Sequence, residues 1–430
     1  MCQSHFDVAI SDIRNSVCST MLTIAMVAGI QFIPGISHAL SLEQAERLAL
    51  ESDPRVQGFQ ATARSYEEES VSDSTLPDPR LLLGAVNVPV DSFDLSQEAM
   101  TQLKVGIKQD FPRGSSREIK QQQSQWLSRS SIALSQDARR KLISDLRQTY
   151  LNLYYEVAAI EIINETRKLF SKLVSITESS YAAGRVNQQD VVLAGLELSR
   201  LDDRKAKIKG NEEGYRAELA QWIGDKAWDP IENEFPELPE LPEEIDINEV
   251  ITSHPLIQAQ TARVNAARKS IDMAKQDYKP GWSASLDYGF RSGSNPDGSE
   301  RADFATALVN FDIPLFTSDR QDRKVIASQE KTNAARYEMD DKLRQLKRIY
   351  DKELHSWRRH NERVVLYRDS LLASARNNSR ASLQAYQSGV TEFDTLMRAQ
   401  ITELDVRLEN LRVKVDRANA RARLLYITGE

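Results

Sequence analysis

The chain has 430 residues, enough for two or three ordinary domains, and 40% of them are hydrophobic. Its formal net charge is −7, and Lys and Arg are interleaved with Asp and Glu instead of gathering in a patch, which argues against nucleic acid as a partner. Glycine is scarce, at 17 residues, and the 14 prolines are clustered, so long regions run without a helix breaker.

Residues 1–39 are predicted to be a secretory signal peptide. Met21–Ile36 is an apolar run that is too short and too interrupted for a stable membrane-spanning helix, and Ser37-His38-Ala39 has the small-x-small pattern of a cleavage site. A buried N-terminal helix is the alternative interpretation. Both cysteines, Cys2 and Cys18, lie in this segment, so we expect the mature chain to have neither a disulfide nor a thiol site.

From residue 40 onward the sequence is written twice. Ser52-Asp53-Pro54 returns 201 residues later as Ser253-His254-Pro255. A period this long indicates a duplicated half-molecule, not a solenoid of short repeats. We expect repeat 1 over residues 40–224 and repeat 2 over residues 246–430. Residues 225–245 are acidic and contain four prolines, and they are predicted to form an extended linker outside the helices.

Each repeat begins with short helices. Ser41, followed by Glu43 and an apolar period, predicts a helix that ends at the Pro54 break. A second helical stretch ends before Pro77 in repeat 1 and before Pro280 in repeat 2, because the residue before a proline disfavours the helical conformation.

Two strands follow in each repeat, at about residues 80–111 and 281–313. Apolar residues alternate there with polar residues or glycine, and the clearest apolar positions are Leu103, Val105, Ile107, Trp282, Ala284, Leu286, Tyr288 and Phe290. The strands at 81–88 and 304–313 alternate less cleanly. The acidic segment 91–98 and the turn-rich segment 292–299 separate the strands of each pair.

A long helical hairpin then completes each repeat, over residues 115–223 and 317–428. Neither Gly nor Pro occurs in Ser115–Ala183 or in Leu315–Ser388, and a helix of that length reaches about 100 Å. The return helix of repeat 2 carries a heptad seam, which is typical of helices that coil around partners: Ile401, Leu404, Leu408, Leu411 and Val415.

The strands indicate a membrane. Each has about the 9–11 residues of a tilted strand that crosses hydrocarbon, but four strands cannot close a barrel, and open edges are costly in lipid. Several chains would then have to share one barrel, and three would supply twelve strands. The apolar face would meet lipid, while Ser283, Ser285 and Asp287 would face a wet lumen. A filamentous coiled coil is the alternative interpretation of the long helices.

The duplicated order of short helices, strand pair, long helix and Tyr-x-x-Gly turn resembles the outer-membrane efflux protein family, also called TolC-like, over Leu40–Glu430. The most specific segments are Tyr181–Val191 and Tyr386–Leu396, with the strand exits Phe111-Pro112 and Asp312–Phe316. Within the family, Leu81–Asp94 is similar to the heavy-metal, cation-exporting branch.

The resemblance implies a mainly α fold with a small transmembrane β part. Duplicated antiparallel hairpins would form an α-barrel, and four strands per chain would contribute to a 12-stranded trimeric β-barrel. The protein would lie in the outer membrane of a Gram-negative bacterium, with its helical barrel in the periplasm. Its partners would be two further copies, a periplasmic adaptor of the membrane fusion type, an inner-membrane pump of the RND type and outer-membrane lipid.

The function implied is the passive exit duct of a tripartite efflux system for metal cations, gated at its periplasmic tips. Drug efflux and type I protein secretion stay open within the family. A periplasmic coiled-coil adaptor and a structural coiled-coil protein are the alternatives of another class.

The resemblance also suggests site residues at the hairpin tips. Asp394 and its repeat mate Asp190 are candidates for the periplasmic aperture, where three copies of Asp394 would attract cations. Helix capping is the alternative role for both. The family's second acid would fall at Met397, so this chain departs from the pattern. Candidates for adaptor contact are Gly184, Arg185, Gly389 and Val390.

The sequence offers no catalytic, cofactor or metal motif. It has no Gly-rich phosphate loop, nucleophile elbow or His-Glu-x-x-His. His355 and His360 are five residues apart, about 140° around a helix, so they cannot chelate one ion as an i, i+4 pair would. We expect no enzymatic activity and no cofactor.

Overall fold

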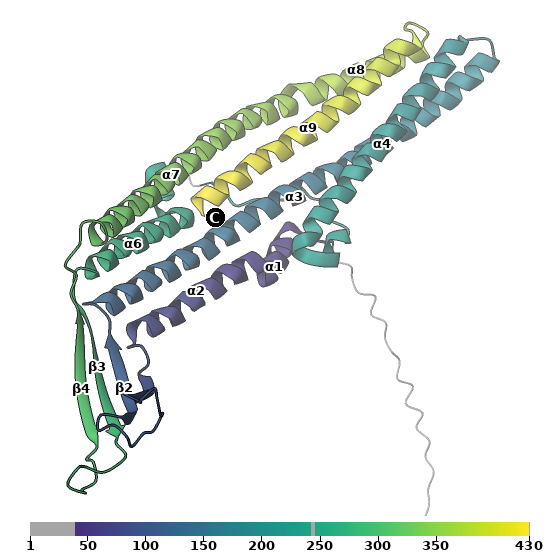
Figure 1. Ribbon diagram of the computed structural model, residues 1–430. Helices are drawn as coiled ribbons and strands as arrows, with labels where there is room; N and C mark the ends of the chain where they lie inside the picture. Colours follow the sequence, from purple (N-terminus) through teal and green to yellow (C-terminus); the bar gives the residue numbers. More distant parts are fainter. Residues whose placement is uncertain (1–38, 242–245, 430) are drawn as a thin grey trace, which may run out of the picture. The chain divides into compact units, whose positions relative to one another are not determined.

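A computed structural model describes residues 39–241 and 246–429 (Figure 1). The predicted signal peptide, apart from Ala39, lies outside the described residues, as do Cys2 and Cys18. No helix within the two described ranges has both the length and the hydropathy to cross a membrane.

Both repeats begin with a helix pair that is broken at a proline. In repeat 1 these are α1 (Leu42–Ser52) and α2 (Pro54–Ser74), and in repeat 2 they are α5 (Ile247–Ser253) and α6 (Pro255–Gln276). Ser41, predicted to open this helix, forms a capping box with Gln44. Pro occupies the first position of α2 and α6, where its missing N–H has no helical partner to lose.

The four predicted strands form one antiparallel sheet in the order β1-β2-β3-β4, which confirms the expected β part of the fold. They are β1 (Arg80–Val86), β2 (Gln102–Phe111), β3 (Gly281–Phe290) and β4 (Phe304–Asp312). The β2–β3 ladder, from Leu103↔Phe290 to Phe111↔Trp282, joins the two repeats. Strands β1 and β4 are the edges of the sheet.

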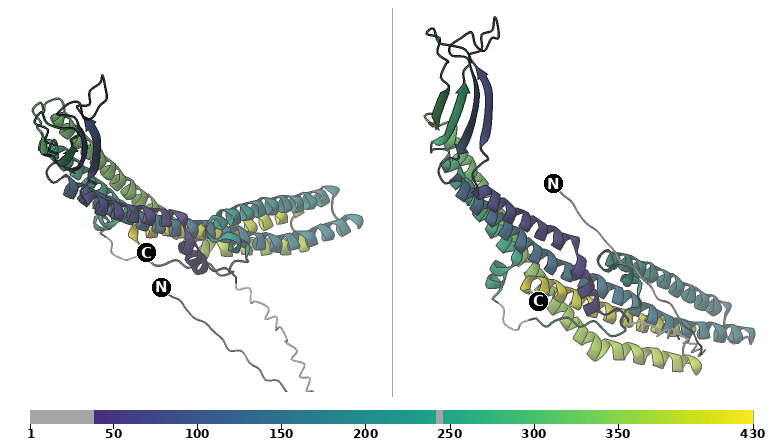
Figure 2. Two further views of the ribbon diagram at one scale, coloured as in Figure 1. Left: turned by 60° about the horizontal axis from the view of Figure 1, so that its bottom comes forward. Right: turned by 90° about the horizontal axis from the view of Figure 1, so that it is seen from below.

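The long hairpins are present in both repeats. Repeat 1 has α3 (Ser116–Ala182) of 67 residues, followed by α4 (Gln188–Ile223). Repeat 2 has α7 (Gln321–Leu366), α8 (Leu372–Gln387) and the return helix α9 (Phe393–Thr428). The strands leave the helices at one end, and the hairpin turns lie at the other (Figures 1 and 2).

Repeat 2 differs from the sequence expectation in its long helix. Helix α7 begins at Gln321, and a π-helical turn at Tyr367–Leu371 separates α7 from α8. A π turn needs one extra residue in a turn and no helix breaker, so the absence of Gly and Pro gives no sign of it.

The hairpins pack on each other through two apolar clusters. One lies between α3, α4 and α9, near α1, and includes Leu146, Tyr150, Leu219 and Val415. The second extends toward the tips and includes Phe170, Leu173, Leu404 and Leu408. The seam predicted in α9 therefore faces its neighbours, with Leu404, Leu408 and Val415 buried.

Segment 225–245, predicted as an extended linker outside the helices, packs against the helices in its described part. Residues Gly224–Trp228 form a 3-10 helix (η1), and Ile231 and Leu238 are buried in the first apolar cluster. Leu40 and Ile231 form a parallel bridge, and the ring of Phe235 meets that of Tyr154 edge to face. The apolar residues between the prolines dock because burying them removes apolar surface from water.

Candidate functional site

The ladder register sorts the sheet into an apolar and a polar face. The predicted lipid-facing residues share the apolar face, since Leu103, Val105 and Ile107 lie directly opposite Phe290, Tyr288 and Leu286. Trp282 belongs to the same face and stacks on Phe111 at 3.8 Å. The edge strands extend this face with Leu81, Leu83, Ala85, Ala305, Ala307, Val309 and Phe311. Among the ladder-paired residues of this face, Gln109 is the polar exception.

The apolar face is the more exposed of the two. Leu286 is 59% exposed and Val105 38%, whereas Gln102 and Ser283 on the polar face are each 7% exposed. A sheet in water shows the opposite arrangement. Sequence reasoning missed the contribution of β1 and β4, because Leu82, Phe304 and Leu308 fall on the polar face and blur the alternation.

Two glycines of the polar face make room for polar side chains of the neighbouring strand. Any side chain at Gly106 would collide with the carboxylate of Asp287, its partner in the ladder. Any side chain at Gly289 would collide with the amide of Gln102. Lys108 and Arg80 share one carboxylate, that of Asp110, at 3.3 and 3.4 Å.

Two arginines tie together the loops at the free end of the sheet. Arg301 Nη1 donates to the carbonyl oxygens of Ser96, Glu98 and Ser292 at 3.0–3.1 Å. Arg291 Nε donates to the carbonyl oxygen of Ala99 at 3.0 Å. Sequence reasoning identified these loops by their turn residues and acids but did not anticipate the arginines, because their partners are backbone carbonyls.

At the opposite end, the two hairpin tips have the same geometry. Gly184 and Gly389 have φ of 71° and 72°, a region that favours glycine. The next residue closes each helix end: Arg185 N donates to Ser180 O and Val390 N to Ala385 O, both at 2.9 Å. This is the Schellman arrangement, so the glycines end α3 and α8 as the Tyr-x-x-Gly motif predicts.

The tips of the two hairpins enclose one cavity of about 1110 Å³. It brings together Asp190, Asp394, Arg185 and Gly389, with Tyr386 and Phe393 on its wall, whereas Gly184 and Val390 are not among its lining residues. Burial raises the pKa of Tyr386, and the nearby carboxylate of Asp190 raises it further. A side-chain hydrogen bond with Thr177 lowers the pKa in part.

Asp190 and Asp394 each lie in the first turn of a return helix. Neither occupies the N-cap position, which is held by Asn187 and Glu392, so any helix effect on them comes from the dipole. The carboxylate of Asp394 pairs with Arg398 of the same helix. Sequence reasoning did not name Arg398, although an acid four residues before an arginine on a predicted helix is a visible signal.

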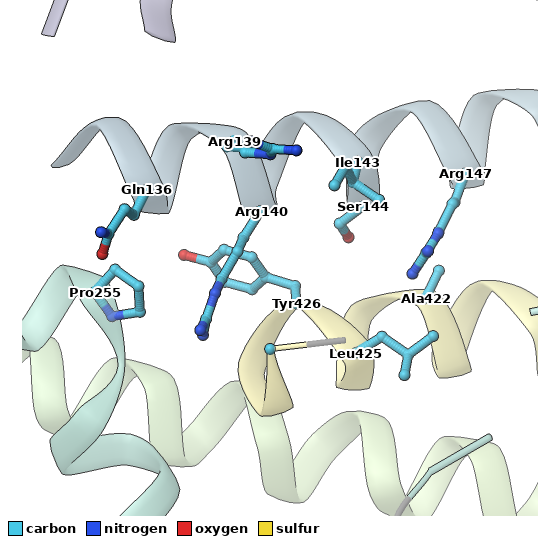
Figure 3. Close-up of a pocket in the computed structure, with 11 residues that line it drawn as sticks. Gln136, Arg139, Arg140, Ile143, Ser144, Arg147, Pro255, Ala422, Leu425 and Tyr426 are labelled. Carbon is cyan, nitrogen blue, oxygen red and sulfur yellow. The ribbon is translucent and has the colours of Figure 1, made fainter. Parts of the chain in front are cut away.

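A further cavity of about 440 Å³ lies between α3, the start of α6 and the end of α9 (Figure 3). Arg139, Arg140 and Tyr426 line it, together with Arg147, which pairs with Glu46 at 2.7 Å. Burial lowers the pKa of Arg140. Within residues 39–241 and 246–429, no group of three or more His, Cys, Asp or Glu side chains is arranged to hold a metal ion.

The arrangement of these elements is that of solved outer-membrane channels. The CmeC outer membrane channel of Campylobacter jejuni superposes with a TM-score of 0.78 at 15% identity, over 90% of this chain and 85% of that chain. VceC of Vibrio cholerae gives 0.76 at 17% identity, over 90% and 96%. CusC, whose study describes transmembrane channel formation, gives 0.74 at 13% identity, over 90% and 92%. At these identities the likeness concerns the fold.

The sequence of repeat 2 also matches a protein family. Residues 247–430 match the family model described as outer membrane efflux protein. The resemblance predicted from the duplicated motifs is therefore confirmed, and so are the mainly α fold with its four-stranded sheet and the predicted location in the outer membrane. No curated protein matches the sequence.

Proposed function

We propose that this protein is the exit duct of a tripartite efflux system. The observation that carries the proposal is the sheet, which exposes its apolar face and leaves β1 and β4 as open edges. Hydrocarbon would cover the apolar face, but it cannot satisfy the N–H and C=O groups of an edge strand. Further copies of the chain can do so by adding their own edge strands.

Three copies supply twelve strands, an even number within the range of known barrels. The apolar face, with Leu103, Trp282 and Phe290, then meets lipid, and the polar face with Ser283, Ser285 and Asp287 lines the lumen. The helical hairpins continue the duct into the periplasm as an α-barrel. Repeats 1 and 2, which the linker joins, are the two equivalent parts of the barrel wall that each chain contributes.

The duct is passive and is gated at the hairpin tips. Gly184, Arg185, Gly389 and Val390 are exposed there and are available to a periplasmic adaptor. The energy comes from an inner-membrane pump of the RND type, and the chain itself performs no catalysis and carries no cofactor. Asp190 and Asp394 line the cavity at the tips, where carboxylates favour the passage of cations.

Metal cations are the proposed substrate class. The support is the resemblance of Leu81–Asp94 to the heavy-metal branch and the acidic residues of the tip cavity. Drug efflux and type I protein secretion are the alternatives within the family, and the identities of the neighbouring genes would separate them.

The first test is assembly and conductance of the full chain. We expect the mature protein in the outer-membrane fraction as an oligomer that runs as a trimer on unheated gels and as a monomer after boiling. We also expect discrete single-channel currents in planar bilayers. An adaptor or a structural coiled coil would give no heat-modifiable oligomer in the outer membrane and no channel, and that result would overturn the proposal.

A further inference from the structure

The helix break between the short helices is capped by a different residue in each repeat. In repeat 1, Asp53 Oδ1 accepts from Arg55 N and Val56 N at 3.0 and 2.9 Å. In repeat 2 the equivalent residue is His254, whose Nδ1 accepts from Leu256 N at 3.2 Å. Both caps are buried, with Asp53 6% and His254 1% exposed. The duplication thus provides two equivalent helix breaks with different capping groups.

His254 also holds the end of the same repeat. Its Nε2 lies 3.2 Å from the carbonyl oxygen of Tyr426, near the C-terminus of α9. Because Nδ1 accepts from Leu256 N–H, the proton of the neutral ring is on Nε2, which donates to that carbonyl. The rings of His254 and Tyr426 meet edge to face at 5.0 Å. One neutral imidazole therefore joins the first turn of α6 to the last turn of α9.

The charged groups around this imidazole come from α3 and α7. Asp137 Oδ1 lies 3.9 Å from His254 Nδ1 and accepts from Tyr426 Oη at 2.8 Å. Arg140, one helical turn further, lines the cavity beside Tyr426 (Figure 3). From α7, Lys342 lines the cavity that Asp137 and Tyr426 also line.

We propose that His254 is a proton-responsive clamp, which ties the start of α6 to the end of α9 while it is neutral and releases the α6 cap when it is protonated. A proton on Nδ1 replaces the acceptor of the Leu256 N–H with a second donor. Among the contacts described above, the new N–H of the charged ring has one acceptor within 4 Å, the carboxylate of Asp137. That carboxylate already accepts a hydrogen bond from Tyr426 Oη. In repeat 1 the acceptor is a carboxylate oxygen of Asp53 instead of an imidazole nitrogen, so this exchange of acceptor for donor has no counterpart there.

The direction of the pH effect follows from burial. Burial lowers the pKa of His254, the carboxylate of Asp137 opposes this, and Arg140 adds to the lowering. The unfolded chain therefore binds this proton more readily than the folded chain. The clamp contributes its full stability above the ordinary pKa of about 6.5 and loses it as the pH falls further. Mild acid would thus loosen the helix break of repeat 2 and leave that of repeat 1 intact.

Amide hydrogen exchange of the full chain in detergent micelles, measured at pH 7.5 and 5.5, tests the clamp. The labelling times are scaled for the change in the intrinsic chemical exchange rate between the two pH values. In the wild type we expect the amides of residues 256–258 to lose roughly fivefold in protection, the effect of one lost N-cap. The equivalent amides of residues 55–57 should change less than twofold. Equal changes in the two repeats would overturn the proposal, and this comparison needs no variant.

The variant His254→Asn keeps an acceptor for Leu256 N–H that does not titrate, so the difference between the two pH values should vanish at residues 256–258. Asp53→Asn is the matched control in repeat 1, and it should leave the response of repeat 2 as in the wild type. A response that persists in His254→Asn would assign the effect to another group. The experiment is independent of conductance, so it can fail while the channel proposal stands.

Discussion

Asp394 is one of the charged residues that line the tip cavity. It lies in the first turn of α9, lines the cavity and pairs with Arg398. The pair is exposed on both sides, so solvent and salt screen it and its attraction is weak. In the proposed duct, a carboxylate this exposed would be available to a passing cation, and Arg398 would reduce its field.

We therefore expect opposite effects from substitutions at these two positions. Asp394→Asn should weaken the block of single-channel current by divalent cations about two- to fivefold, the scale of an exposed charge interaction. Arg398→Gln should strengthen the block by a similar factor, because it removes the competing cation. Block constants measured in planar bilayers check both. Unchanged single-channel behaviour in Asp394→Asn would count against an acidic aperture.

Among the secondary-structure elements, the hairpins follow from the sequence more directly than any other part. The ends of their outgoing helices are set by local chemistry, at Gly184 and Gly389, just as Ser41 and Pro54 bound the short helix α1. The π turn at Tyr367–Leu371 and the burial of Ile231 could not be predicted in this way, because they depend on what packs against those residues. The pairing of Asp394 with Arg398 was visible as a spacing, whereas the enclosure of the cavity required both tips.

The tip glycines can be tested against a glycine of the same hairpin. Gly184→Ala places a side chain at φ of 71°, which costs about 1–2 kcal/mol and should lower the thermal midpoint. Gly195→Ala lies within α4, where a Cβ meets nothing within 4 Å, and should raise stability by about 0.5–1 kcal/mol. Circular dichroism melts of the two variants should shift in opposite directions. A higher midpoint in Gly184→Ala would show that Gly184 does not end α3 in the left-handed conformation.

For the molecule as a whole, the sheet faces decide which surface can meet lipid. Leu286 lies in the middle of the apolar face, between Ile107 and Ala307. Thr306 lies on the polar face, opposite Asp287. An arginine near the middle of the bilayer costs about 2–4 kcal/mol on the lipid side of a barrel strand.

Leu286→Arg should therefore reduce the yield of heat-modifiable oligomer in the outer membrane severalfold. Thr306→Arg should assemble like the wild type, because its guanidinium faces water and the carboxylate of Asp287. Semi-native gels of membrane fractions give the yields. Equal yields from the two variants would contradict the assignment of the apolar face to lipid.

The exposed apolar face has a consequence for how the protein must be made. Its exposed apolar side chains and its two unpaired edge strands can promote aggregation with other chains. A copy whose apolar face and strand edges are uncovered should aggregate in water, so we expect it to need chaperones until those edges are paired. Aggregation accelerates as the concentration of unassembled chains rises. Production far above the capacity of those chaperones should therefore fill the periplasm with aggregate instead of functional protein.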